Sequence, residues 1–237
     1  MIFSFEERPS DSPFVERIWR TQSERAGAFT SLATSHWEMV VMRHNGKMTL
    51  TVRGPETKAT PAYCSVQAEW FGIIFKCGTF MPNLLTSDLV DGAVDLPEAA
   101  CTSFWLHGSA WQFPDYDNAD TFVDRLVRED LLVRDPIVEA VLRGEPQALS
   151  PRSIQRRFLR ATGLTQDSIR QIERARYATT RLQQGVSILD TVDQAGYADQ
   201  AHLTRSLKHF IGKTPAQIIR KTDPEQLSLL FKTAPFF

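Results

Sequence analysis

Residues 188–215 read ILDTVDQAGYADQAHLTRSLKHFIGKTP, and this stretch decides the fold of the C-terminal part of the chain. Ser187, with Asp190 three residues later, forms a capping-box pattern that predicts the start of a helix. The residues at helical spacing that we expect to face inward are Ile188, Val192 and Ala195. Gly196 is expected to end this helix, because a short turn between two nearly perpendicular helices needs a residue that accepts a left-handed backbone.

Asp199 is expected to cap a second helix directly after this turn. Its inward residues are Leu203, Leu207 and Phe210, and its outward residues are Gln200, Ala201, Thr204, Arg205 and Lys208. Two helices joined in this way predict a helix-turn-helix, whose second helix enters the major groove of DNA. Gln pairs with adenine and Arg with guanine, so Gln200 and Arg205 are candidate base-reading residues. The alternative is that the charges on this helix are only a solvated surface.

A related pattern precedes it, because Ser150 and Pro151 are a cap and a first-turn proline that open a helix over SPRSIQRRFLRATG, residues 150–163. Its expected inward residues are Ile154, Phe158 and Leu159, and its outward residues are Arg152, Gln155, Arg156 and Arg160. A long helix over residues 166–184 links the two patterns, with a buried side formed by Ile169, Ile172, Ala175 and Leu182.

These segments, SPRSIQRRFLRATGLT, the linking helix and AGYADQAHLTRSLKHFIGKTPAQIIR, resemble the DNA-binding domain of the AraC family of transcription regulators over about the last third of the chain. The resemblance implies an all-α double helix-turn-helix that places one recognition helix of each unit in successive major grooves. It implies that Gln200, Ala201 and Arg205 face bases from the second helix. It assigns the same role in the first helix to Arg152, Gln155 and Arg156.

The first unit departs from the family pattern, in which a short supporting helix and a Gly-containing turn precede the recognition helix. Here residues 144–149 read GEPQAL, which is too short and too broken by Pro and Gly for such a helix. The segment Pro136 to Arg143, which Asp135 caps, is the alternative support. The second unit is therefore expected to carry more of the sequence choice.

The charge of the chain is divided between two halves of opposite sign. Residues 150–221 contain 13 Lys and Arg against 5 Asp and Glu, whereas residues 1–149 contain 13 against 21. Such asymmetry is typical of a cationic domain that approaches a polyanion, attached to an acidic domain with another role. Two solvated surfaces of unequal charge are the alternative.

The N-terminal half is predicted to be β-rich. Alternating residues in His36–Arg43 and Met48–Gly54 indicate two strands, and Asn45-Gly46 between them is a hairpin signal. Further strands are expected over Glu69–Lys76 and Ser103–Phe113. An antiparallel barrel or sandwich, with a cupin-like barrel as the form that the resemblance suggests, is the expected architecture.

A helix capped at Asn118 follows, and it could form a dimer interface, a contact between domains or the cap of the barrel; its apolar face comprises Phe122, Val123, Leu126 and Val127. The predicted fold class is thus α+β. The expected division is a β-rich sensing or dimerisation domain at 1–117, a helical connector at 118–149, the double helix-turn-helix domain at 150–222 and a C-terminal tail at 223–237.

All five tryptophans lie in the N-terminal half. Four of them are candidate ligand-binding residues for an apolar effector: Trp37, Trp70, Trp105 and Trp111. They are equally candidates for an aromatic core. The resemblance makes double-stranded DNA the expected partner, with RNA polymerase, a small-molecule effector and a second copy of the chain as further candidates.

A metal-dependent cupin-like enzyme, or a binding module with a helical assembly tail, is the rival hypothesis, with ligand types at His36, Glu38, His44 and His107. Their spacing does not fit two His on alternate strand positions, so we expect no catalysis, no metal and no cofactor. Cys64, Cys77 and Cys101 lack CxxC spacing and indicate buried, reduced thiols. His202 is expected to pack rather than to sense pH or metal. The chain has no long uncharged apolar run and turns acidic early, which favours a cytoplasmic protein without a membrane span.

Overall fold

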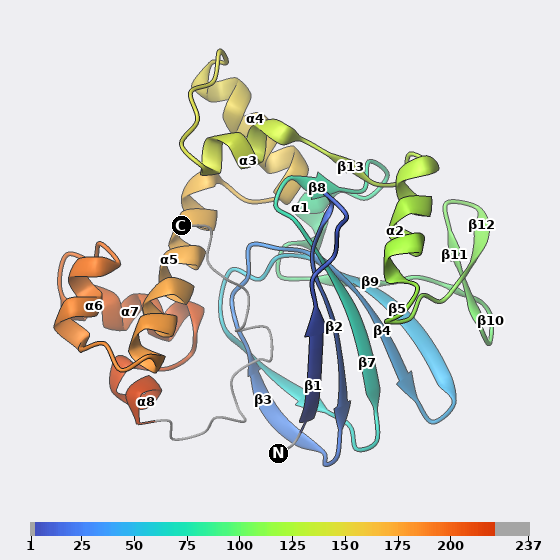
Figure 1. Ribbon diagram of the computed structural model, residues 1–237, viewed down its shortest axis with the longest axis horizontal. Coiled ribbons are helices and arrows are strands. Elements are labelled where there is room, and N and C mark those ends of the chain that lie inside the picture. Colours follow the sequence, from blue (N-terminus) through green and yellow to red (C-terminus); the bar gives the residue numbers. More distant parts are fainter. Residues whose placement is uncertain (1–2, 221–237) are drawn as a thin grey trace.

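The computed structural model describes residues 3–220, and its N-terminal half is built mainly from β-strands (Figure 1). Six strands form one antiparallel sheet with the order β1-β2-β7-β4-β5-β9. Their bounds are β1 (Phe3–Arg8), β2 (Val15–Ser23), β4 (Glu38–His44), β5 (Lys47–Arg53), β7 (Glu69–Phe75) and β9 (Ala93–Asp95). Within residues 3–220 the pairing runs from β1 to β9 without closing, so the sheet is open and not a barrel.

The remaining strands form three small sheets. They are the pair β3 (Gly27–Ser31) and β6 (Thr60–Cys64), the pair β8 (Thr79–Phe80) and β13 (Val133–Arg134), and the triplet β10 (Glu98–Ala100), β11 (Ser103–Leu106) and β12 (Ser109–Gln112). The prediction of one strand over Ser103–Phe113 is wrong. His107 and Gly108 both have positive φ, 48° and 78°, so the chain turns back there and Leu106 pairs with Ser109.

The hairpin signal at Asn45-Gly46 is confirmed. These residues have φ of 51° and 76°, and His44 pairs with Lys47 across a two-residue turn. One face of the sheet carries a buried apolar cluster that also includes side chains of α2 (Ala119–Arg128), among them Phe122, Val123 and Leu126. Helix α2 therefore caps the sheet with the residues that the sequence placed on its apolar face. The side chain of Asn118 does not cap it, since its Oδ1 accepts instead from the backbone of Asp115 at 3.0 Å.

Helices dominate the second half. They are α3 (Pro136–Leu142), α4 (Pro151–Thr162), α5 (Gln166–Gln183), α6 (Ile188–Gln194), α7 (Gln200–Phe210) and α8 (Pro215–Ile219), and a single turn, α1 (Thr86–Leu89), lies in the first half. The predicted caps at Ser150, Ser187 and Asp199 are confirmed. The α+β class is therefore confirmed, and the predicted tail at 223–237 lies outside the described residues. Among the described helices, none has the length and apolar character of a membrane span.

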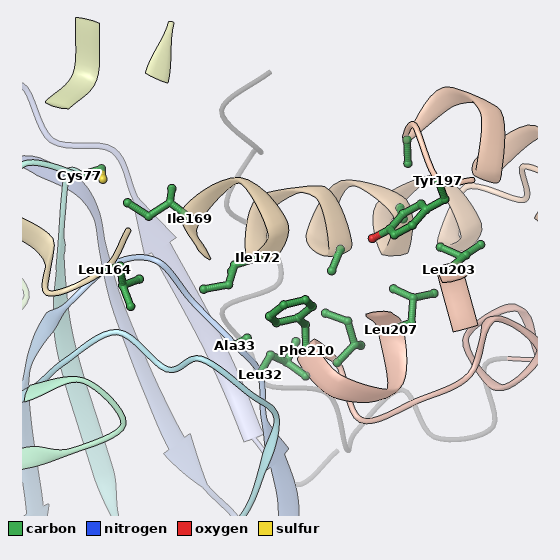
Figure 2. Packing of buried hydrophobic residues seen from close by; sticks show 14 of the residues in the cluster. Leu32, Ala33, Cys77, Leu164, Ile169, Ile172, Tyr197, Leu203, Leu207 and Phe210 are labelled. Atoms are coloured by element: carbon green, nitrogen blue, oxygen red, sulfur yellow. The ribbon is translucent and has the colours of Figure 1, made fainter. Parts of the chain in front are cut away.

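We call residues 3–134 the β region and residues 135–220 the helical region. The two share one hydrophobic cluster, in which side chains of the β region pack with those of α4, α5 and α7. Figure 2 shows Leu32 and Ala33 beside Phe210, and Cys77 near Ile169. The helical region therefore completes its core with residues from the other half of the chain.

Polar groups are buried along the same boundary. Ser35 donates a hydrogen bond of 2.5 Å to Oε1 of Glu173, and Nε of Arg176 lies 3.8 Å from the same carboxylate. Burial raises the pKa of Glu173 and lowers that of Arg176, while each partly offsets the effect on the other. His36, next to Ser35, is buried against this pair.

We predict that His36 makes the protein less stable in acid. Burial, with Arg176 and Arg17 nearby, lowers the pKa of His36 to about 3. The unfolded chain therefore binds one more proton between about pH 6.5 and pH 3, and the stability that depends on neutral His36 is lost as the pH falls through this window. As the pH falls below about 6.5, the free energy of unfolding should decrease less steeply for His36→Gln than for the wild type. The difference between the two slopes should be up to about 1.4 kcal/mol per pH unit.

Denaturant titrations at several pH values between about 7.5 and 5 measure this difference, with His107→Gln at an exposed position as the control. Burial raises the pKa of Glu38 and Glu173, which acts in the opposite direction. Both carboxyls are present in every variant, so the comparison of slopes isolates His36. Equal pH slopes for the wild type and His36→Gln would contradict the prediction.

Candidate nucleic-acid interface

The turn between α6 and α7 is held by a buried tyrosine. Gly196 adopts the expected left-handed backbone with φ of 66°, and the hydroxyl of Tyr197 lies 2.8 Å from Oγ of Ser206 on α7. Burial raises the pKa of Tyr197, so this hydroxyl stays protonated at neutral pH. Arg174 of α5 stacks 4.5 Å above the Tyr197 ring and donates to the carbonyl of Gly196 at 3.4 Å. Sequence reasoning missed Arg174, because its contact lies 22 residues away along the chain.

The first turn of α7 is fixed at Asp199, whose Oδ1 accepts from the backbone of His202 at 2.6 Å. The ring of His202 packs edge-to-face on Tyr197, which agrees with a packing role. The predicted outward residues share one face: Gln200, Ala201, Arg205 and Lys208 are exposed and Thr204 is half-buried. The hydroxyl of Thr204 donates to the carbonyl of Gln200 at 2.8 Å. The face thus presents one amide, one guanidinium and one ammonium on a rigid helix.

Helix α4 presents the second set of predicted residues. Arg152, Gln155, Arg156 and Arg160 are all exposed, although the guanidinium of Arg160 also lies over the ring of Phe80 at 5.6 Å. The expectation that Leu159 faces inward is wrong, since its exposed fraction is 42%. The buried side of α4 comprises Phe158, Ala161 and Thr162, and Ile154 is partly buried beside the shared cluster.

The support of α4 is the helix α3, the alternative that the sequence left open. Val138 and Val141 of α3 are buried in the same cluster as Phe158. Asp135 caps α3 by accepting from Ile137 at 3.1 Å, and its other oxygen accepts from Arg157 of α4 at 2.8 Å. The first unit therefore has a support helix, joined to α4 through a longer turn than in the second unit.

The two recognition helices lie toward opposite ends of α5 (Figure 1). An α-helix of 18 residues is about 27 Å long, which approaches the 34 to 36 Å between major grooves on one face of DNA. Within residues 3–220, Arg152, Arg156 and Arg205 form no ion pair with a carboxylate. These guanidinium groups are therefore available to an anionic partner.

The candidate ligand-binding tryptophans do not meet in one site. Trp37 is buried and stacks on Phe75, Trp111 is buried beside Phe122, and Trp105 is 46% exposed on β11. Trp70 borders a groove of about 620 Å³ at the end of the six-stranded sheet, where segment 112–117 forms the other wall.

The residues considered for a metal-dependent enzyme do not form a ligand set. In the part of the chain that the structure describes, no group of three or more His, Cys, Asp and Glu could hold a metal ion. Among the cysteines, Cys64 and Cys77 are buried, whereas Cys101 is exposed, so the expectation of burial is wrong for Cys101. Burial raises the pKa of Cys77 to about 12, which keeps this thiol protonated.

We predict that Asp199→Ala destabilises the protein by about 1 kcal/mol, because the first turn of α7 loses the acceptor of its backbone N–H. Asp199→Ser should recover most of this loss, since a serine oxygen also caps helices. Urea titrations followed by circular dichroism measure both, and Asp193→Ala, which removes an exposed carboxylate from α6, is the matched control. Equal stabilities of Asp199→Ala and Asp193→Ala would show that the cap contributes nothing.

Comparisons with known proteins give one structure and one family. No curated protein matches the chain. The crystal structure of ToxT from Vibrio cholerae O395, bound to (E)-4-(8-methylnaphthalen-1-yl)but-3-enoic acid, is similar at 10% identity over 93% of this chain and 99% of that chain, with a TM-score of 0.39. A TM-score this low does not establish a shared fold.

The family whose model matches is described as "Helix-turn-helix domain", and the match covers residues 147–221. These residues contain α4 to α8 and hence both recognition helices. The match agrees with the AraC-type pattern of the sequence and with the caps and the glycine turn of the structure. Residues 147–221 therefore match a helix-turn-helix domain of the AraC type.

Proposed function

We propose that this protein is a sequence-specific transcription regulator that reads two successive major grooves of double-stranded DNA with α4 and α7. The observation that carries the proposal is the exposed polar face of α7. Asp199 caps the first turn of this helix, and the turn at Gly196 and Tyr197 sets the orientation of the helix relative to α6. Reading a base requires a side chain held to within a fraction of an ångström by its own scaffold. Helix α7 has that support.

Each outward residue of α7 has a role that its chemistry suggests. The amide of Gln200 suits adenine, and the guanidinium of Arg205 suits the two acceptors of guanine. Ala201 can contact a thymine methyl group, and Lys208 a phosphate. Thr204 already donates its proton to the carbonyl of Gln200, so its oxygen can serve only as an acceptor toward DNA.

Helix α4 adds positive charge at the other groove. We assign Arg152, Gln155, Arg156 and Arg160 to this contact, in which arginines neutralise phosphates or bind guanine. A pair of recognition helices can occupy an asymmetric site as a monomer, so the motif does not require a second copy. Regulation of transcription would further involve RNA polymerase.

We predict that Arg205→Ala weakens binding to the preferred site by about 1 to 3 kcal/mol and changes binding to random DNA little, because a base contact is lost. Arg156→Ala should weaken binding to both DNAs more evenly and reduce the salt slope by about one, as the loss of a phosphate contact does. Fluorescence anisotropy at several salt concentrations, on a site selected from random DNA with the full chain, measures both effects.

The matched control is Arg128→Ala, which removes an exposed arginine from α2 in the β region. This variant should bind like the wild type if DNA contacts only the helical region. If Arg156→Ala changes the preferred bases while Arg205→Ala lowers affinity uniformly, the roles of the two helices are reversed. A folded wild-type protein that selects no DNA sequence would overturn the proposed function.

For the β region, we propose that a small-molecule effector binds in the groove of about 620 Å³, a volume typical of ligand sites. Its apolar surface comes from Val41, Met48, Trp70, Phe71, Phe113 and Tyr116. Its charged lining comprises Glu6, Glu69, Asp115 and Asp117 against Arg20 and Arg43. Arg20 is already paired with Glu6 at 2.5 Å, and the excess of carboxylates favours a cationic over an anionic aromatic molecule.

We predict that the cationic dye rhodamine 6G binds the full chain roughly fivefold or more tightly than the anionic dye 1-anilinonaphthalene-8-sulfonate, because like charges repel in the groove. Thr102→Trp, which places an indole in the groove lining, should abolish the preference. Thr121→Trp on the exposed face of α2 is the control and should keep it. Fluorescence polarisation measures the binding. Tighter binding of the anionic dye, or no effect of Thr102→Trp, would contradict a cation-binding groove.

A further inference from the structure

The C-terminal end of α4 is held by a side chain of the β region. Thr86 is the first residue of α1, and it is buried. Its hydroxyl donates to the carbonyl oxygens of Leu159 and Arg160, which lie 3.1 Å and 2.9 Å from Oγ1. The carbonyl of Leu159 also accepts from the backbone N–H of Gly163 at 3.0 Å. The last carbonyls of a helix lack donors within the helix, so the hydroxyl of Thr86 supplies an external donor to that of Arg160. Gly163, which ends α4 with φ of 71°, packs so close that an added Cβ would lie 2.7 Å from the carbonyl oxygen of Thr86. No side chain fits between α1 and the end of α4.

The C-terminal end of α7 is held in the same way at a separate place in the β region. The backbone N–H of Ala33 donates to the carbonyl of Phe210 at 2.9 Å. The backbone N–H of Ala59 donates to the carbonyl of His209 at 2.8 Å. Leu32 and Ala33 also pack against the end of α7 in the shared hydrophobic cluster (Figure 2). Both recognition helices thus end on donors that the β region supplies.

None of the hydrogen bonds in these two attachments involves a residue of α5. Helix α5 connects the two units through the chain, and only residues 163–165 lie between α4 and α5. The β region provides a second connection between the two units, because it binds α4 at Thr86 and α7 at Ala33 and Ala59. The buried contact of Ser35 with Glu173 fixes α5 itself to the same body.

We propose that the β region sets the distance and the rotational phase between the two recognition helices, and that Thr86 is the positioning residue that determines which spacing of half-sites the protein accepts. The proposal rests on the proposed function, because it concerns how the same two helices meet DNA. Inserting one base pair between two half-sites moves them apart by about 3.4 Å and rotates them by about 34°. A rigid pair of readers rejects such a site, whereas a loosely joined pair adjusts to it.

The test uses Thr86→Val, which keeps the size and shape of the side chain and removes the hydroxyl. A preferred site is first selected from random DNA with the wild-type full chain, and variants of it are made with one base pair added or removed between the half-sites. We expect the wild type to lose roughly tenfold or more in affinity on the altered spacings, and Thr86→Val to lose roughly threefold or less. Thr86→Ser, which restores the hydroxyl, should recover the wild-type ratio.

Thr51→Val is the matched control, because the hydroxyl of Thr51 donates to Asp95 within the β region at 2.6 Å and touches neither recognition helix. It should reject altered spacings as strongly as the wild type. A general loss of stability lowers affinity for every site, so the ratio between spacings distinguishes positioning from folding. An unchanged ratio in folded Thr86→Val overturns the proposal.

If Thr86→Val does not fold, Ala59→Pro tests the other attachment, since proline removes the N–H that donates to His209. The same broadening of accepted spacings is expected, and its absence overturns the proposal. A folded wild type that selects no site refutes the proposed function instead. The two failures are therefore distinguishable, because only the first leaves sequence-specific binding intact.

Discussion

The hydrophobic contact between Leu32 and Ala33 of the β region and the end of α7 is the constraint on which the rest of the structure depends. These residues belong to one cluster with the buried faces of α4 and α5, so the helical region has no separate core. Burial of apolar area is the main favourable term in folding, and here it is shared across two halves of opposite charge. The positions of α4 and α7 consequently depend on packing against the β region as well as on residues 147–221.

Charged groups buried on this boundary add specificity at an energetic cost. Glu173 and Arg176 are both nearly inaccessible to solvent, and removing two charges from water is expensive even when they pair. Their geometry is completed by Ser35 and by the carbonyl of Ala33, to which Arg176 donates at 3.5 Å. Any shift of α5 along the β region would break the contacts of Glu173 with Ser35 and of Arg176 with Ala33, although the two charges would stay paired on α5. The polar contacts therefore select one arrangement among the many that apolar packing alone would tolerate.

Local sequence signals were sufficient for most of the caps and turns. The caps at Ser150, Ser187 and Asp199, the turn at Gly196 and the hairpin at Asn45-Gly46 depend on residues within four positions of one another, and all were predicted. The expectations that failed include two local ones, the cap at Asn118 and the unbroken strand over Ser103–Phe113, and one packing position, Leu159. The side chain of Leu159 is exposed although its carbonyl is bound by Thr86, and the chain folds back within Ser103–Phe113 because His107 and Gly108 adopt positive φ. The four tryptophans that the sequence suggested as ligand-binding residues do not lie in one site.

The sequence by itself determined the order of helices in the second half, the polar outward faces of α4 and α7, and the excess of positive charge there. These follow from periodicity, capping and composition, which are properties of the chain before it folds. Only the tertiary structure decided that α3 supports α4, that Thr86, Ala33 and Ala59 hold the ends of both recognition helices, and that a groove lies between the sheet and segment 112–117. Each of these joins residues tens of positions apart, and no local pattern specifies which distant carbonyl a given donor will meet.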